Sequence, residues 1–113
     1  MKRNLVQVMI NSMLLASLIG FCAEASPAQS AGETLFKAKC AACHGPDGKG
    51  EVLMGKKLGA RNLSSSDVQG QSDAQLTDVV TKGQNKMPAY GGKLTKEQIG
   101  ELVVYIRELG KKH

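Results

Sequence analysis

Residues 40–44 read Cys-Ala-Ala-Cys-His, and the interpretation of the whole chain starts from this stretch. The two cysteines are three residues apart, so in a helical turn their sulfur atoms lie on one face. The imidazole of His44 follows directly. A cysteine pair at this spacing is compatible with a disulfide, a thioredoxin-like redox pair or half of a zinc site.

The added histidine favours a fourth use, because C-x-x-C-H is the signature of c-type haem attachment. Two sulfurs one turn apart can bond the two vinyl groups on one edge of a porphyrin, and His44 can then ligate the iron. The alternatives have less support. No βαβ pattern surrounds the cysteines, and His113 is the only other histidine available to a zinc site. We therefore predict one haem c, attached through Cys40 and Cys43, with His44 bound to iron.

The first 25 residues have the pattern of a secretory signal peptide. Lys2 and Arg3 precede a mostly apolar run over residues 5–21, and Ala23-Glu24-Ala25 has the small residues of a cleavage site. We predict export to the periplasm with cleavage after Ala25, a linker over residues 26–31 and one domain over residues 32–113. The alternative is a retained membrane anchor, for which the run is short.

The number of cysteines agrees with this processing. The chain has three, and Cys22 would be removed with the signal peptide. If Cys40 and Cys43 both bind haem, no free thiol is left in an oxidising compartment. A lipid anchor on Cys22 is a weaker alternative, because Phe21 stands where such anchors have a small residue.

The residues after the cleavage site are a poor source for a conventional hydrophobic core. They contain no tryptophan, and their only aromatic residues are Phe36, Tyr90 and Tyr105. Domains of this size are marginally stable without a disulfide, metal or cofactor. A large apolar cofactor would supply what is missing. The net charge is +5, but the lysines are scattered and form no basic stripe, so no nucleic-acid partner is expected.

Three capping-box patterns predict three helices, at Ser30–Glu33, Ser72–Gln75 and Thr95–Gln98. The first helix is expected from about Gly32 to Cys43. The second is short and ends near Gly83. The third carries an apolar stripe and ends at Gly110; the stripe consists of Ile99, Leu102, Val103, Ile106 and Leu109.

The remaining sequence predicts loops. Six glycines lie within residues 45–70, which favours turns, with one helical turn near Ser66–Val68. No alternating strand pattern is present. The expected fold is all-α, with about three main helices and long loops wrapped around one covalent haem.

The chain resembles the class I c-type cytochromes over residues 32–109. The features that carry the resemblance are Gly32 with Phe36, the C-x-x-C-H motif, the Met87-Pro88 pair and the aromatic Tyr105. The resemblance implies a small helical shell around one haem, and one-electron transfer without substrate chemistry, so no enzymatic activity is expected. It also implies that Gly32 lets the first and last helices cross closely near Phe36 and Tyr105.

The resemblance places the second iron ligand at Met87. A residue before proline is held out of helical geometry, which gives Met87 a fixed position in its loop. The alternatives are a methionine that only fills the core, and ligation by Met54 from the glycine-rich loop. Ligation by both His44 and Met87 would leave the iron no open position and would suit it to electron transfer alone.

Two further residues follow from the expected site. A metal-bound histidine usually donates its other ring nitrogen to a carbonyl. The resemblance implies an acceptor soon after the motif, and we expect the carbonyl of Pro46. Arg61 is a candidate for a haem propionate, with an ordinary solvated arginine as the alternative.

The expected partners are redox proteins that a monomer meets transiently through the exposed haem edge. Membrane-bound reductase or oxidase complexes are candidates. Four lysines near Met87 either steer acidic partners or only solubilise the surface; they are Lys82, Lys86, Lys93 and Lys96. Two functions compete with the electron carrier: an enzyme or gas sensor with an open iron position, and a tethered domain of a larger oxidoreductase.

Overall fold

The structure is a computed structural model that describes residue 20 and residues 27–112, with side chains from residue 31 onward. Six helices occupy this range, and its only strand-like feature is an isolated bridge, so the predicted all-α fold is confirmed. Apart from residue 20, the predicted signal peptide lies outside the described residues, as do Cys22 and His113. None of the described helices is both long and apolar enough to cross a membrane.

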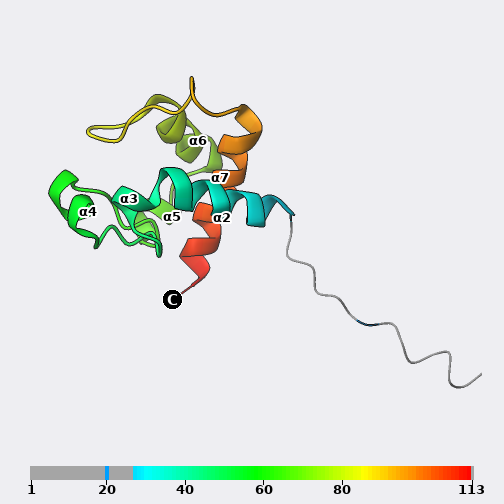
Figure 1. Ribbon diagram of the computed structural model, residues 1–113, viewed down its shortest axis with the longest axis horizontal. Coiled ribbons are helices and arrows are strands. Elements are labelled where there is room, and N and C mark those ends of the chain that lie inside the picture. Colours follow the sequence, from blue (N-terminus) through cyan, green and yellow to red (C-terminus); the bar gives the residue numbers. More distant parts are fainter. Residues whose placement is uncertain (1–19, 21–26, 113) are drawn as a thin grey trace, which may run out of the picture.

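Two helices cross at the centre of the fold (Figure 1). They are α2, Pro27–Lys39, and α7, Lys96–Lys111. A Cβ atom on Gly32 would collide with the backbone carbonyl of Glu101, so the helices approach this closely only because residue 32 is glycine. Next to this contact the rings of Phe36 and Tyr105 pack with their centroids 5.2 Å apart. The close crossing implied by the family resemblance is confirmed.

The first helix differs from the prediction at both ends. It begins at Pro27, so residues 27–31, which were expected to form a linker, are helical. Proline suits the first helical position because its missing amide hydrogen would have no partner there. The pattern Ser30–Glu33 consequently lies inside the helix and does not start it. At the other end the helix is interrupted at Cys40, and a separate turn, α3, covers Ala41–His44.

The other two capping boxes start helices as predicted. Ser72 precedes α6, Asp73–Lys82, and Thr95 precedes α7; each exchanges hydrogen bonds with the glutamine three residues later. α6 ends at Gly83, and α7 extends one residue beyond the predicted end, Gly110.

Two short helices lie in the glycine-rich segment between α3 and α6. α5, Ser66–Gln69, was predicted. α4, Leu53–Leu58, was expected to be loop, and it packs beside α3 at one end of the molecule (Figure 1). A six-residue helix with Gly55 inside it is too short to produce a periodic apolar pattern, which explains the wrong prediction.

The hydrophobic core joins α2, α6 and α7. α7 contributes the predicted apolar stripe together with Tyr105. The other buried hydrophobic side chains are Phe36, Leu63, Val68, Leu76, Val80 and Leu94. This core covers the inner face of α2, whereas the end of α2 and the second half of α3 border a cleft.

Replacing Gly32 with alanine tests the importance of the helix crossing. We expect Gly32→Ala to lower the free energy of unfolding by about 1–3 kcal/mol, because the added methyl group forces α2 and α7 apart. Gly100 is the matched control, since it is also helical and a Cβ there meets no atom within 4 Å. Gly100→Ala should leave stability unchanged or raise it by up to about 1 kcal/mol. Denaturant unfolding followed by circular dichroism measures both variants, and equal effects would contradict this account.

Candidate functional site

A cleft lies between α3 and the loop that follows α6. Its two adjoining parts enclose about 740 and 560 Å³ of space, some of it open to solvent. The residues that line both parts are Cys40, His44, Arg61, Val79, Gln84 and Met87, and Cys43 lines the outer part. The structure thus brings all four predicted site residues to one cleft.

The inner part of the cleft is bounded by the hydrophobic core. Its apolar lining includes Phe36, Leu76, Val80, Leu102 and Ile106. Water would find few hydrogen-bond partners against such a surface. The occupant that suits it is a large apolar group, and a porphyrin ring has the required character.

His44 is held in one orientation by the backbone. Its Nδ1 atom lies 3.1 Å from the carbonyl oxygen of Arg61. A carbonyl can only accept, so Nδ1 carries the proton and Nε2 keeps its lone pair for a metal. Burial lowers the pKa of His44, opposed in part by this hydrogen bond, and a lowered pKa favours the neutral imidazole that ligation needs.

The expected acceptor for His44, the carbonyl of Pro46, was wrong. Gly45 ends α3 with a φ of 79°, which turns the chain away from the imidazole. The acceptor for the imidazole comes instead from beyond α4, at Arg61. The side chain of Arg61 is exposed at the cleft, where its contact with a propionate stays a prediction.

The two cysteines have properties that argue against the competing uses of the pair. Both are half-buried and carry free thiols. Burial, and to a smaller degree the neighbouring Cys43, raises the pKa of Cys40 to about 11. Thioredoxin-like pairs need a lowered thiol pKa, so this environment does not favour that chemistry. No group of three or more metal-binding His, Cys, Asp or Glu side chains exists among the described residues, which also removes support for a zinc site.

Met87 faces the cleft from a constrained loop. Gln84 and Met87 form a small antiparallel bridge, in which the Met87 amide donates to the Gln84 carbonyl at 2.9 Å. Asn85, inside this turn, has a φ of 53°, a conformation that asparagine tolerates better than most residues. The competing methionine, Met54, lies on α4 with 49% of its surface exposed, and it lines neither part of the cleft.

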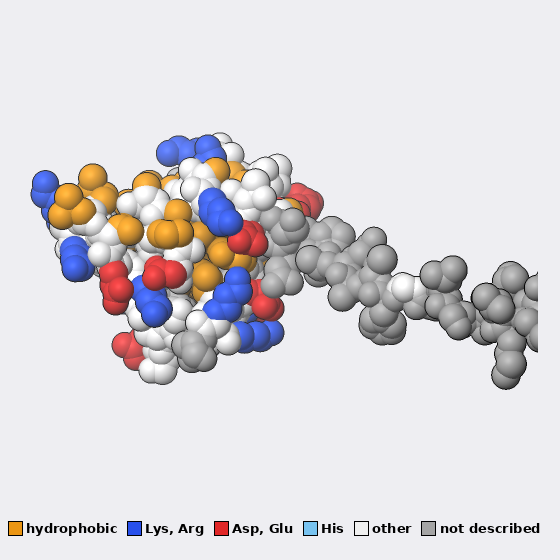
Figure 2. Space-filling view, turned by 60° about the horizontal axis from the view of Figure 1, so that its bottom comes forward, with side chains coloured by type: hydrophobic (Ala, Val, Ile, Leu, Met, Phe, Trp, Pro, Cys, Tyr) orange, Lys and Arg blue, Asp and Glu red, His pale blue; other side chains and the backbone are white. Residues whose placement is uncertain are grey.

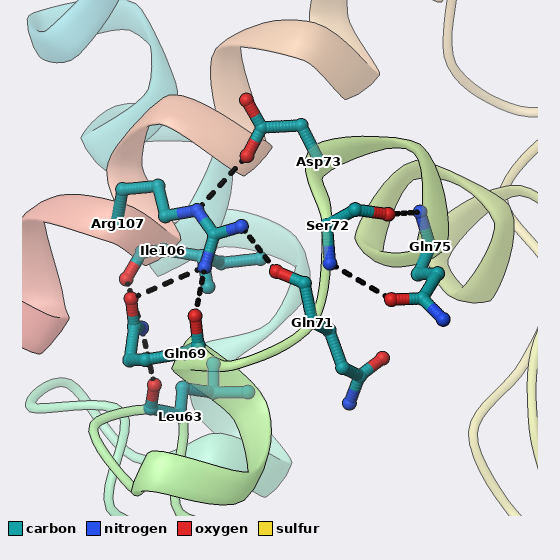
Figure 3. Close-up of polar contacts among 8 residues, drawn as sticks. All are labelled: Leu63, Gln69, Gln71, Ser72, Asp73, Gln75, Ile106 and Arg107. Carbon is teal, nitrogen blue, oxygen red and sulfur yellow. Dashed lines mark hydrogen bonds and ion pairs between the residues drawn. The ribbon is translucent and has the colours of Figure 1, made fainter.

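A polar network holds the segment that follows Arg61 against α7. Figure 3 shows the guanidinium of Arg107 pointing into the turn between α5 and α6, where it bonds to the backbone carbonyls of Gln69 and Gln71 and to the carboxylate of Asp73. The Gln69 amide in turn donates to the carbonyls of Leu63 and Ile106, at 2.7 and 3.0 Å. These bonds fix residues 63–73 on α7. This segment begins two residues after Arg61, whose carbonyl orients His44.

At the end of the molecule formed by α4, the surface beside the cleft carries both exposed apolar side chains and lysines. Leu53 is 85% exposed and Met54 49% exposed. Hydrophobic side chains gather at this end in Figure 2, with blue side chains next to them. Lys56 and Lys57 on α4 are exposed, and Leu58 lines the cleft.

The four lysines predicted to surround Met87 have different surroundings. Lys86 lines the cleft, and Lys96 is an exposed residue at the start of α7. Lys82 forms an ion pair with Asp78 at 2.7 Å. Lys93 lies over the ring of Tyr90, with its ammonium 5.6 Å from the ring centroid.

Two contributors to the site were not predicted from the sequence. The Arg61 carbonyl is a backbone group, so no side-chain pattern reveals it. Tyr90 lines the cleft, and its hydroxyl donates to the carbonyl of Lys39 at 3.0 Å. Its position three residues after Met87 was the only available signal.

Sequence comparison relates the chain to cytochromes c6 and to subunits of cbb3-type cytochrome c oxidases. Residues 27–106 match the family model described as cytochrome c oxidase, cbb3-type, subunit III. Cytochrome c6 of Rippkaea orientalis is 39% identical over 82 residues, which are 68% of this chain and 67% of that protein. The cbb3-type cytochrome c oxidase subunit FixP of Azorhizobium caulinodans is 36% identical over 96 residues, or 83% of this chain. The chain spans only 31% of the length of FixP.

Solved structures show the same relationship. The KustC0563 c-type cytochrome superposes with a TM-score of 0.64 and 31% identity, covering 69% of this chain and 95% of that one. Cytochrome c6 from the diatom Phaeodactylum tricornutum superposes with a TM-score of 0.58 and 30% identity, covering 74% and 94%.

Proposed function

The chain belongs to the class I c-type cytochromes, and we propose that it is a periplasmic electron carrier with one haem attached through Cys40 and Cys43. In this proposal His44 and Met87 are the two axial ligands of the iron. Electron transfer on a covalently bound haem c follows from membership of the family. The number of haems, the attachment points, the ligands and the compartment are the parts that we propose.

The observation that carries the proposal is that four residues from distant parts of the chain line one cleft. Cys40, Cys43 and His44 come from the end of α2 and from α3, and Met87 comes from the loop after α6. The core bounds the inner part of the same cleft. A bare metal ion would not need so extensive an apolar lining, whereas a haem would.

Each residue then has a definite role. The two cysteine sulfurs would hold one edge of the haem, and the backbone carbonyl of Arg61 holds the imidazole of His44 so that Nε2 is free. Met87 supplies a soft thioether ligand from the opposite loop. The apolar lining excludes water, which keeps the surroundings of the iron nearly the same in both oxidation states. The bound haem supplies the one-electron change itself.

The proposed compartment rests on the sequence. The pattern of residues 1–25 is that of an exported protein cleaved after Ala25. An oxidising compartment also suits the processed chain, because haem attachment at Cys40 and Cys43 would leave it no free thiol.

Haem attachment is tested on denatured protein. The purified protein should stain for haem after denaturation, and its intact mass should equal residues 26–113 plus one haem. The double variant Cys40→Ala, Cys43→Ala should lose all covalently bound haem. Cys22→Ala is the matched control, since it removes the third cysteine and should leave haem and mass unchanged. A colourless wild-type protein that is processed and folded would refute the proposal.

Substitution of the two methionines tests the axial ligand. Ferric wild-type protein should show the weak red absorption band of methionine-bound haem. Met87→Leu should abolish the band, lower the reduction potential and let ferrous protein bind carbon monoxide, because an axial position is now open. Met54→Leu should retain the band. The opposite pattern would make Met54 the ligand, and a wild-type protein that already binds carbon monoxide would favour the enzyme or gas sensor.

We further propose that redox partners with an acidic surface approach at the α4 end of the cleft. Exposed apolar side chains suit a short-lived contact with another protein, and Lys56 and Lys57 add positive charge beside it. Lys39 and Lys86 line the cleft itself, so the positive charge continues across its opening.

Charge reversal at α4 tests this approach with ferricyanide, a small anionic oxidant. At low salt, Lys56→Glu with Lys57→Glu should slow oxidation of the ferrous protein by about threefold to tenfold, and the effect should shrink as salt screens it. Lys111→Glu with Lys112→Glu changes the net charge equally at the end of α7, and neither lysine lines the cleft. Equal slowing by both double variants would show that only net charge matters.

A further inference from the structure

The loop that carries Met87 is attached by its backbone to α6. The amide of Tyr90 donates to the carbonyl of Val80 at 3.0 Å, and the amide of Gly91 donates to the carbonyl of Thr81 at the same distance. The bridge between Gln84 and Met87 is internal to the loop. These bonds shape the loop, but they do not connect it to the other side of the cleft, where Cys40 and His44 lie.

The side chain of Tyr90 makes that connection. Its hydroxyl donates to the backbone carbonyl of Lys39 at 3.0 Å, between residues 51 positions apart in the sequence. Lys39 is the last residue of α2 and the direct neighbour of Cys40. No other hydrogen bond joins residues 83–94 to residues 39–61, and both of these segments are fully described. The bond therefore spans the cleft at the point where the haem would be attached.

Tyr90 is held by contacts of both its ring and its backbone. The ammonium of Lys93 lies 5.6 Å from the ring centroid, and the amides of Lys93 and Leu94 both donate to the carbonyl of Tyr90 at 2.9 Å. The residue is half-buried and packs against the hydrophobic core. A ring fixed in this way keeps its hydroxyl aimed at Lys39, so forming the bond orders few additional groups and loses little entropy.

We propose that Tyr90 is a positioning residue that keeps Met87 over the iron by tying its loop to the end of α2. The inference rests on the proposed ligation by Met87. If the loop swings away, Met87 leaves the iron and the hydroxyl leaves Lys39 at the same time. Loss of the hydroxyl should therefore favour the open loop, while His44 and the two cysteines keep their places.

The test compares the two tyrosines of the chain in the ferric holoprotein. Added imidazole can bind the iron only where Met87 has left it, so its apparent affinity reports the population of the open loop. Tyr90→Phe keeps the ring and removes one hydrogen bond. It should raise imidazole affinity by roughly threefold to tenfold, and it should shift loss of the red absorption band to a lower pH. The midpoint temperature of thermal unfolding should change by no more than it does in Tyr105→Phe, the control.

Tyr105→Phe is the matched control, since it also removes one phenol hydroxyl. Tyr105 lies at the crossing of α2 and α7 and lines neither part of the cleft. Its imidazole affinity should equal that of the wild type. Unchanged affinity in Tyr90→Phe, or an equal increase in both variants, would overturn the inference.

A measurement on the wild type makes the test independent of any variant. The hydroxyl proton of Tyr90 should exchange slowly with solvent and show a nuclear Overhauser contact with the backbone around residue 39. Absence of this contact would overturn the inference. Failure of the proposed ligation would appear separately, as a wild-type protein without the red band before any variant is made.

Discussion

The close crossing of α2 and α7 at Gly32 sets the position of every group in the cleft. α2 ends beside Cys40, so its angle at the crossing places both cysteines and His44. On α7, the other helix of the crossing, Arg107 and its hydrogen-bond network hold the segment that begins with Leu63. α6 packs on α7 and leads into the loop with Met87. A wider crossing would displace the two walls of the cleft independently, because among the described residues only Tyr90 connects residues 83–94 to residues 39–61 by a hydrogen bond.

The cleft and the hydrophobic core share side chains, and this has energetic consequences. Phe36, Leu102 and Ile106 belong to the core and also line the inner part of the cleft. Without an occupant these residues would lose contact atoms on one side, and a domain with so few large side chains has little else to compensate. If a haem fills the cleft as proposed, its binding and the formation of the core would be coupled parts of one folding reaction. A cofactor that completes the core would explain how a chain of this size can be stable.

The sequence predicted best where a few adjacent residues determine the structure. The capping boxes at Ser72 and Thr95 are local patterns, and the structure confirms both. The C-x-x-C-H motif is local too, and the structure places its cysteines and histidine at one cleft. Prediction failed where distant parts of the chain decide. The acceptor for His44 is the carbonyl of Arg61, which α4 and its flanking turns bring back to the imidazole. The start of α2 at Pro27 was missed because Ser30 and Glu33 imitate a later start.

The two helices that cross at Gly32 are the first and the last that the structure describes, and this affects the order of assembly. Pairing them closes a long loop, a step that is entropically costly until the contacts within that loop also form. In an exported chain, the crossing cannot form before α7 has reached the compartment where the protein folds. Until then the wall that bears Cys40 and Cys43 has no partner, and both thiols stay accessible to a modifying enzyme. Late pairing of the outer helices would thus leave time for chemistry on the cysteines before the protein closes around them.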